Sequence, residues 1–326
     1  MKKPKTIKGL MKHLRDNGVN INGSKQKIQL TNQGYYHSYK GYRFFKNSSR
    51  RLPITDYEQI NLTFIYDSKL KSILYDKLMF IETALKNICL NIIATELDSD
   101  RLDVLYEKGV YSYRNSPSLW NTNKKREAQK KLLKVQGKIH SEISKNYDKN
   151  PKIKHFYDSQ DHDYIPLWAI FEILTMGEFG HLLEILTFNI KDKISAKLCI
   201  NSAYNTNREL VQNYVMLLKC LRNSVAHNDI VYDNRFKNYD EPNGAHTFLK
   251  NEIGLPYVNF KDIIDFIALI VFFLKKLSVS KTEIKAFVKM FEEATEEYCR
   301  NMDLSITSIT INNNWRMRIQ IIKKYI

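Results

Sequence analysis

Residues 55–97 read TDYEQINLTFIYDSKLKSILYDKLMFIETALKNICLNIIATEL and contain neither glycine nor proline. Apolar residues recur here at steps of three or four positions, the spacing that places side chains on one face of an α-helix. The recurring positions are Ile60, Phe64, Leu70, Leu74, Leu78, Ile81, Leu85, Ile88 and Ile92. The pattern predicts one long helix or two consecutive helices, and it indicates a mainly α fold.

Other stretches continue the helical pattern. Glycine and proline number 11 and 7 in 326 residues, about half of their usual share, which disfavours a sandwich or barrel built from many tight turns. Residues 124–146 and 207–227 have helical apolar spacing, and residues 167–186 are expected to form two helical pieces hinged at Gly177 and Gly180. We therefore expect a helical bundle.

Two stretches near the C-terminus predict helices of different kinds. Residues 266–274 are nine consecutive apolar residues between Asp265 and Lys275, too short a run to span a membrane, and they predict a buried core helix. Ser280 and Glu283 form an S-x-x-E capping pattern in front of an apolar stripe. The stripe consists of Ile284, Phe287, Val288, Phe291, Ala294 and Tyr298.

Cysteine usage and the N-terminus favour a soluble cytoplasmic protein. The four cysteines, Cys89, Cys199, Cys220 and Cys299, lie far apart, which disfavours a disulfide framework or a zinc site. The basic N-terminus is not followed by the apolar run of a signal peptide. We expect no cofactor, no metal and no membrane association.

Positive charge is concentrated in three segments. The chain has a formal net charge of +16, which suggests a polyanionic partner. Residues 1–51 hold thirteen lysines and arginines against one acid, Asp16. Residues 124–138 hold seven against Glu127, and residues 315–326 hold four with no acid. The remainder is mildly acidic, so the segments themselves are the candidate binding surfaces.

The first basic segment also interleaves aromatic residues with cations between residues 35 and 45. Aromatic rings beside phosphate-binding cations suit unpaired nucleotides, which predicts RNA binding. An alternative is that these rings fill the core of a small N-terminal subdomain. The candidate RNA-binding residues are Lys25, Lys27, Tyr36, Lys40, Tyr42, Arg43, Lys46, Arg50, Arg51, Lys124, Lys125, Arg126, Lys130 and Lys131.

These patterns suggest three regions along the chain. Residues 1–55 are predicted to form a basic, aromatic-rich RNA-binding region. Residues 56–303 are predicted to form the helical domain, with a basic insertion near residues 98–150. Residues 304–326 are predicted to form a basic tail, with a few short strands near residues 304–311.

Several common catalytic motifs are missing from the sequence. It contains no G-x-x-x-x-G-K-[ST] loop, no strand-linked G-x-G-x-x-G, no G-x-S-x-G elbow and no H-E-x-x-H helix. An ATPase, a dehydrogenase, an α/β-hydrolase or a zinc peptidase is therefore disfavoured.

The sequence LRNSVAHND, residues 221–229, ends the helix predicted from residue 207. At about 100° per residue, Arg222, Asn223 and His227 fall opposite the apolar stripe, with Ala226 among them. The stripe itself is Leu210, Tyr214, Leu217, Leu218, Leu221 and Val225. We expect the stripe to be buried and the polar face to be accessible.

This polar face has the residue types for RNA cleavage without a metal. The substrate's 2′-OH is the nucleophile, a histidine acts as general acid or base, and an arginine stabilises the phosphorane. Arg222 and His227 lie about 140° apart on the helix, so a second copy of the chain, paired about a two-fold axis, is expected to complete the site. Asn223 is placed to hydrogen-bond and orient the imidazole.

Taken with its surroundings, the sequence resembles the Abi-like (AbiD/AbiF) family of bacterial abortive-infection proteins. The resemblance covers roughly residues 5–240. It rests on Leu10-Met11-Lys12-His13-Leu14 with Gly18-Val19, Tyr35-Tyr36 with Gly41-Tyr42-Arg43-Phe44, residues 62–70 with Phe80-Ile81-Glu82, residues 165–172, and residues 221–227 with Asn234-Arg235. The Arg222–His227 element is similar to the R-x(4-6)-H motif of HEPN-superfamily ribonucleases.

The resemblance implies an HEPN-like helical bundle, a homodimer whose motif helices meet at the interface, and a metal-independent endoribonuclease used in phage defence. It also implies control by a structured non-coding RNA, bound by the basic N-terminal region. Two alternatives stay open: a non-catalytic RNA-binding regulator or scaffold with the same fold, and a DNA-binding regulator that uses residues 1–51.

Overall fold

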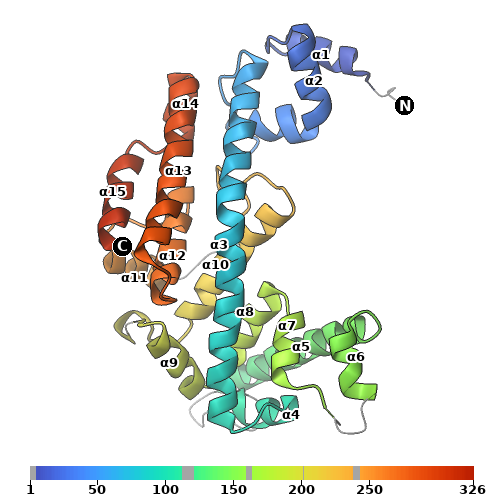
Figure 1. Ribbon diagram of the computed structural model, residues 1–326, viewed down its shortest axis with the longest axis vertical. Coiled ribbons are helices and arrows are strands. Elements are labelled where there is room, and N and C mark those ends of the chain that lie inside the picture. The colour runs from blue at the N-terminus through green and yellow to red at the C-terminus, as the bar shows by residue number, and fades with distance from the viewer. Residues whose placement is uncertain (1–4, 112–120, 159–163, 201, 238–242) are drawn as a thin grey trace. The chain divides into compact units, whose positions relative to one another are not determined.

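The computed structural model is mainly helical over the residues it describes (Figure 1). These residues are 5–111, 121–158, 164–200, 202–237 and 243–326. The α-helices are α1 (Ile7–Asp16), α2 (Gly23–Gln33), α3 (Tyr57–Leu97), α4 (Leu102–Val104), α5 (Thr122–Tyr147), α6 (Pro151–Asp158), α7 (Leu167–Ile173), α8 (Met176–Ile185), α9 (Phe188–Lys197), α10 (Leu210–Ala226), α11 (Asn243–Ile253), α12 (Ile263–Lys276), α13 (Lys281–Asn301), α14 (Leu304–Thr310) and α15 (Trp315–Tyr325). Within the described residues, β structure is limited to isolated bridges. The predicted mainly α bundle is confirmed.

The chain forms two compact units, each assembled from separate segments. The first unit consists of Met1–Leu78, Cys220–Asn238 and Leu249–Ile326, and the second of Met79–Lys219 and Tyr239–Phe248. Helices α3, α10 and α11 each contribute one part to each unit. The predicted region 1–55 and the predicted tail 304–326 both belong to the first unit. Residues 112–120 of the predicted insertion lie outside the described residues.

Helix α12 is buried along nearly its whole length in the first unit. Every residue from Ile263 to Leu274 is buried, which confirms the predicted core helix. Helix α13 begins where the capping pattern predicts, since the Ser280 Oγ accepts a hydrogen bond from the Glu283 backbone N–H at 3.2 Å. The predicted apolar stripe of α13 is buried. Two core helices of this unit, α12 and α13, are thus the ones that the apolar run and the capping pattern predict.

The first part of α3 packs against α13 within the first unit. The rings of Tyr66 and Tyr298 stack with centroids 4.5 Å apart, and Lys69 pairs with Glu297 at 2.6 Å. Among the described residues, α3 is the helix long and apolar enough to cross a membrane, a test that core helices of soluble proteins also pass. Six of the nine apolar residues of its predicted stripe, such as Leu70, are buried inside the protein, and the other three, Phe64, Ile88 and Ile92, are half-buried.

The strands expected near residues 304–311 are wrong, because Leu304–Thr310 forms helix α14. Ile306, Thr307 and Thr310 are buried, at the spacing of one helix face. The Thr310 hydroxyl donates to the Ile306 carbonyl at 3.0 Å, so the hydroxyl is satisfied within the helix. β-Branched residues favour strands locally, but burial of this face outweighs that preference.

The stretch 167–186 forms two helices as predicted, but the break is not at the glycines. Helix α7 ends at Ile173, and Thr175 caps α8 through a capping box with Glu178. Gly180 lies inside α8, where an added Cβ would come within 2.7 Å of Met216 Sδ. This glycine therefore permits close packing of α8 on α10 rather than a hinge.

Candidate functional site

Helix α10 positions the residues of the predicted motif. The six residues of its predicted apolar stripe are all buried, with exposed fractions of 8% or less. Ala226 and His227 are exposed, and Arg222 and Asn223 are half-buried. The structure therefore confirms that the apolar stripe faces the core; His227 is exposed, while Arg222 and Asn223 are only partly accessible.

Asn223 forms hydrogen bonds with both of the other motif residues, Arg222 and His227. Its side-chain Oδ1 accepts a hydrogen bond from Arg222 Nη1 at 3.4 Å, and its backbone carbonyl accepts the His227 N–H at 2.9 Å. The His227 ring makes no hydrogen bond with any residue that the structure describes. The predicted contact between Asn223 and the imidazole is therefore not formed in this single protomer.

Helix α10 ends at Ala226, one residue before the motif histidine, and a left-handed residue follows that histidine. Asn228 has φ of 58°, the conformation that typically terminates helices. The Asp229 N–H returns to the Ser224 carbonyl at 2.8 Å, which caps the last turn. His227 consequently stands at the exposed end of α10, between the helix and the loop that follows it.

Two residues of α3 hold this loop in the first unit. Lys71 Nζ donates to Asn228 Oδ1 at 2.6 Å and pairs with Asp67 at 3.1 Å. Asp67 is fully buried, and its Oδ1 accepts the backbone N–H groups of Val231 and Tyr232 at 2.8 and 2.7 Å. A buried carboxylate with several donors is a strong anchor.

The same carboxylate ties the N-terminal aromatic segment to the loop. Tyr42 is buried, and its hydroxyl donates to Asp67 Oδ2 at 2.9 Å. Burial, reinforced by the nearby Asp67 charge, raises the pKa of the Tyr42 phenol. Tyr42 therefore lies in the core, as the core-filling alternative expects for part of this segment, and we leave it out of the proposed RNA-binding surface.

A second set of contacts joins the two segments through Arg235. This arginine pairs with buried Asp233 at 2.7 Å and donates to the carbonyls of Gly41 and Phe44, each at 2.8 Å. Asp233 also accepts the Lys46 backbone N–H at 2.6 Å. The loop after α10 is thus fixed to residues 41–46 by charged and backbone hydrogen bonds.

Gly41 lies where the two segments approach each other closely. An added Cβ would come within 2.8 Å of Ile230 Cδ1 and 3.2 Å of the Tyr36 carbonyl oxygen. A side chain at this position would force the Ile230 side chain to shift and would crowd the Tyr36 carbonyl of the same segment. The absence of a side chain therefore permits the contact.

The N-terminal aromatic segment, α3, α10 and the loop after α10 all fall within the range of one family model. A family model described as Abi-like protein matches residues 29–233, about two thirds of the chain. The chain is an Abi-like protein. Comparison with curated proteins and with solved structures found no match. Family membership places this Abi-like protein with abortive-infection proteins, which act in antiviral defence.

The basic N-terminal candidates of this Abi-like protein differ in their exposure. Lys25, Lys27, Tyr36, Lys40, Arg50 and Arg51 are exposed, and Arg43 and Lys46 are half-buried. Lys46 Nζ donates to the Lys261 carbonyl at 2.7 Å and lies 3.8 Å from Asp262. Arg43 lies over the Phe44 ring at 4.4 Å. The exposed residues are thus the better candidates for contact with a partner, and Lys46 has internal partners.

The second group of candidates begins helix α5 in the other unit. Lys124, Arg126, Lys130 and Lys131 are exposed and Lys125 is half-buried. Lys131 pairs with Glu184 at 2.5 Å.

Within the described residues, no group of three or more histidine, cysteine or acidic side chains is placed to hold a metal ion.

Sequence reasoning missed the anchors Asp67, Lys71 and Asn228. One signal was present, since Asp67 occupies a position between Phe64 and Leu70 where the helical period expects an apolar residue. A buried acid at such a position needs donors, but the sequence does not say which distant residues supply them.

Proposed function

We propose that this Abi-like protein is an HEPN-like endoribonuclease that acts in abortive infection in the bacterial cytoplasm. His227 would act as general acid or base, Arg222 would stabilise the transition state, and Asn223 would position both. The observation that carries this proposal is the accessible Arg222–His227 face at the end of α10, held in place through Asn228. Family membership supports the role in defence.

The proposed reaction uses the RNA's own nucleophile. The 2′-oxygen bonds to the adjacent phosphorus while its proton passes to a histidine, and the bond from phosphorus to the 5′-oxygen breaks. A proton is delivered to that leaving oxygen. The products are a 2′,3′-cyclic phosphate and a 5′-hydroxyl. Arginine is permanently charged and donates in a planar fork, so it favours the more highly charged phosphorane over the ground state.

A homodimer would complete the site. Arg222 and His227 lie about 140° apart around the helix axis, so one copy presents them in different directions. Ala226, exposed between them, has the small side chain that close approach of two such helices needs. In a two-fold pair, Arg222 of one protomer would face the partner's His227.

The exposed cations and the exposed Tyr36 ring of the N-terminal segment would bind the RNA. Tyr36 is 78% exposed, although most aromatic side chains are at least partly buried, and it is close in sequence to exposed Lys40. A ring beside a cation is suited to a splayed-out base and its phosphate. The same surface would bind a structured regulatory RNA.

The test is cleavage of total RNA by the purified protein in excess EDTA, with sequencing of the new ends. We expect cutting with cyclic phosphate ends by the wild type, and its loss in Arg222→Ala and His227→Ala. Matched controls are Arg300→Ala, an exposed arginine of α13, and His155→Ala, an exposed histidine of α6. If the wild type and all variants bind RNA equally and none of them cuts it, the protein is a non-catalytic RNA-binding protein and the proposal is wrong.

A further inference from the structure

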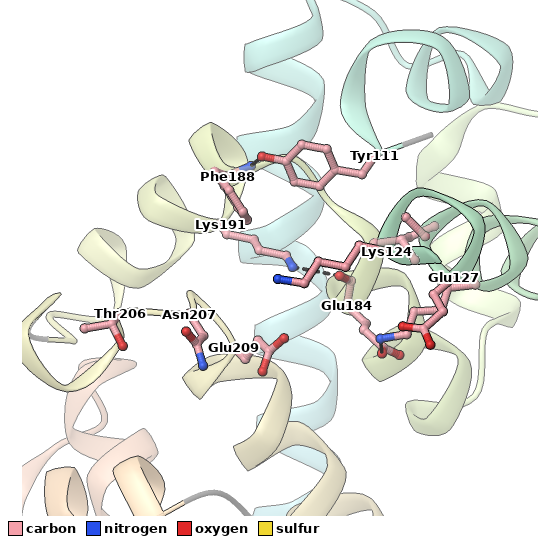
Figure 2. Close-up of a pocket in the computed structure, with 12 residues that line it drawn as sticks. Tyr111, Lys124, Glu127, Glu184, Phe188, Lys191, Thr206, Asn207 and Glu209 are labelled. Carbon is pink, nitrogen blue, oxygen red and sulfur yellow. Dashed lines mark hydrogen bonds and ion pairs between the residues drawn. The ribbon is translucent and has the colours of Figure 1, made fainter. Parts of the chain in front are cut away.

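The second unit contains a cavity of about 440 Å³ that the proposed ribonuclease site does not use. It is lined by the beginning of α5, the junction of α8 and α9, and the residues just before α10 (Figure 2). A volume of several hundred Å³ is typical of small-molecule sites.

Lys191 of α9 is the most unusual residue of this cavity. Its exposed fraction is 8%, and its Nζ donates to the Glu184 backbone carbonyl at 2.7 Å. Within the described residues it forms no ion pair. An ammonium has three hydrogens to donate, so two remain for another acceptor. Burial lowers the pKa of Lys191 to about 8, even though Glu209 and Glu184 favour its charged form.

One carboxylate of the lining, that of Glu184, is already engaged by other side chains. The Glu184 side chain lies 3.5 Å from His181 Nδ1 and 2.5 Å from Lys131 Nζ. The contact with His181, followed by that with Lys131, lowers the pKa of Glu184 to about 2. Lys191 thus has a buried positive charge that Glu209 and Glu184 favour but that no carboxylate of the described residues pairs at ion-pair distance, and an anion bound beside it would offset the cost of its burial.

A second lysine lines the same pocket. Figure 2 shows Lys124 of α5 and Lys191 extending toward the same part of the pocket from different helices. Asn207 and Glu209 lie on another wall, where they can accept hydrogen bonds from hydroxyl or amino groups. The pocket therefore offers lysine donors for an anion and, at Asn207 and Glu209, acceptors for other polar groups, and it also contains the carboxylates of Glu127 and Glu184, of which Glu184 is paired with Lys131.

The apolar part of the lining is held rigidly. The Tyr111 hydroxyl accepts the Phe188 backbone N–H at 3.2 Å, and their rings meet edge to face with centroids 4.7 Å apart. Arg208 lies over the Phe188 ring at 4.7 Å. The space beside these fixed rings can hold the non-ionic part of a ligand. A bare inorganic anion would leave that space unfilled.

We propose that this pocket binds a phosphate ester of mononucleotide size, with its phosphate between Lys191 and Lys124 and its hydroxyl or amino groups on Glu209 and Asn207. Two converging ammonium groups match the charge of a phosphate. The acceptors on the other wall match a sugar or base rather than a second anion. The site is separate in residues from the proposed ribonuclease site, and its occupancy does not depend on RNA cleavage.

The experiment is isothermal titration calorimetry of the full chain with AMP, CMP, ribose 5-phosphate and inorganic phosphate. We expect at least one ester to bind saturably and more tightly than inorganic phosphate. Lys191→Met should weaken that binding about tenfold or more, because a charge-assisted contact is lost. Lys124→Gln should weaken it in the same direction, and since Lys124 is exposed this second variant keeps the fold.

Two controls separate this site from others. Lys197→Met changes an exposed lysine of the same helix and should leave the affinity unchanged. Arg222→Ala should also leave it unchanged; loss of binding there would place the nucleotide at the ribonuclease site and overturn the proposal. It is equally overturned by the absence of saturable binding up to about 10 mM, by equal affinity for inorganic phosphate, or by undiminished binding in the Lys191 and Lys124 variants.

Discussion

The ammonium of Lys71 donates a 2.6 Å hydrogen bond to the side-chain oxygen of Asn228. Asn228 directly follows His227, so the end of the motif helix is tied to the middle of α3 within the same unit. Lys71 is in turn paired with buried Asp67. The position of the exposed histidine therefore depends on a carboxylate that lies in the core.

Replacement of that carboxylate should destabilise the protein strongly. Asp67→Asn keeps one oxygen acceptor but removes the charge that faces Lys71, whose side chain is 10% exposed. Breaking a buried ion pair on one side costs about 3 kcal/mol or more. Denaturant unfolding monitored by circular dichroism measures this, with Asp76→Asn as the control. Asp76 is 78% exposed and pairs with Lys77, so its loss should change stability by less than about 0.5 kcal/mol. Equal effects of the two variants would contradict the anchoring role.

At Asn228, glycine should be tolerated better than alanine. Both substitutions remove the acceptor for Lys71, but alanine must also adopt φ of 58° with a Cβ. That conformation costs roughly 1 kcal/mol for alanine and almost nothing for glycine. Unfolding free energies of the two variants should therefore differ by about this amount, in favour of glycine. A more stable alanine variant would show that the left-handed turn is absent in solution.

Gly41→Ala should loosen the contact between the N-terminal segment and the loop after α10. The new Cβ would clash with Ile230 Cδ1 at 2.8 Å, at a cost of about 1–3 kcal/mol. Ile230→Val removes that atom and should recover part of the loss in the double variant. Gly137→Ala on α5 is the control, because an added Cβ there has no neighbour within 4 Å and alanine favours helices. Purely additive losses in the double variant would argue against the clash.

The buried Lys191 should make stability depend on pH. Its folded pKa of about 8 lies below the ordinary lysine value of 10.5, so between these values the unfolded chain binds more protons. The free energy of unfolding should then rise with pH from about 8 to 10.5, by at most about 3 kcal/mol. Lys191→Met should lack this rise. The measurement is the difference in unfolding free energy between wild type and variant from pH 7 to 10; a difference that stays constant would contradict the lowered pKa.

Much of the fold follows from local sequence signals. The long α3, the buried α12 and the capped α13 are predicted because periodicity, apolar runs and capping residues act within one element. Helix α14 is not predicted from the sequence, because its β-branched residues favour a strand locally. Burial of one face in the folded protein outweighs that preference. The break between α7 and α8 is likewise set by the Thr175 capping box and not by the nearby glycines.

The candidate site also has some features that the local sequence predicts and others that it does not. The outward face of α10 follows from helical geometry, so the accessibility of His227 can be predicted. The contacts of Asp67 with residues 231 and 232, and of Arg235 with residues 41 and 44, join segments that are more than 150 positions apart. Periodicity carries no information on such pairings, and it cannot tell that Tyr42 faces the core while Tyr36 faces outward.

Mixing two inactive variants tests the central claim most directly. Arg222→Ala and His227→Ala protomers are each expected to cut RNA at least a hundredfold more slowly than wild type. When the two are unfolded and refolded together, mixed dimers would carry one intact arginine and, opposite it, the partner's His227. We predict that the initial rate of RNA cleavage in EDTA recovers to a substantial fraction of the wild-type rate. A mixture that stays as slow as its components, or single variants as active as wild type, would contradict a ribonuclease site shared between two protomers.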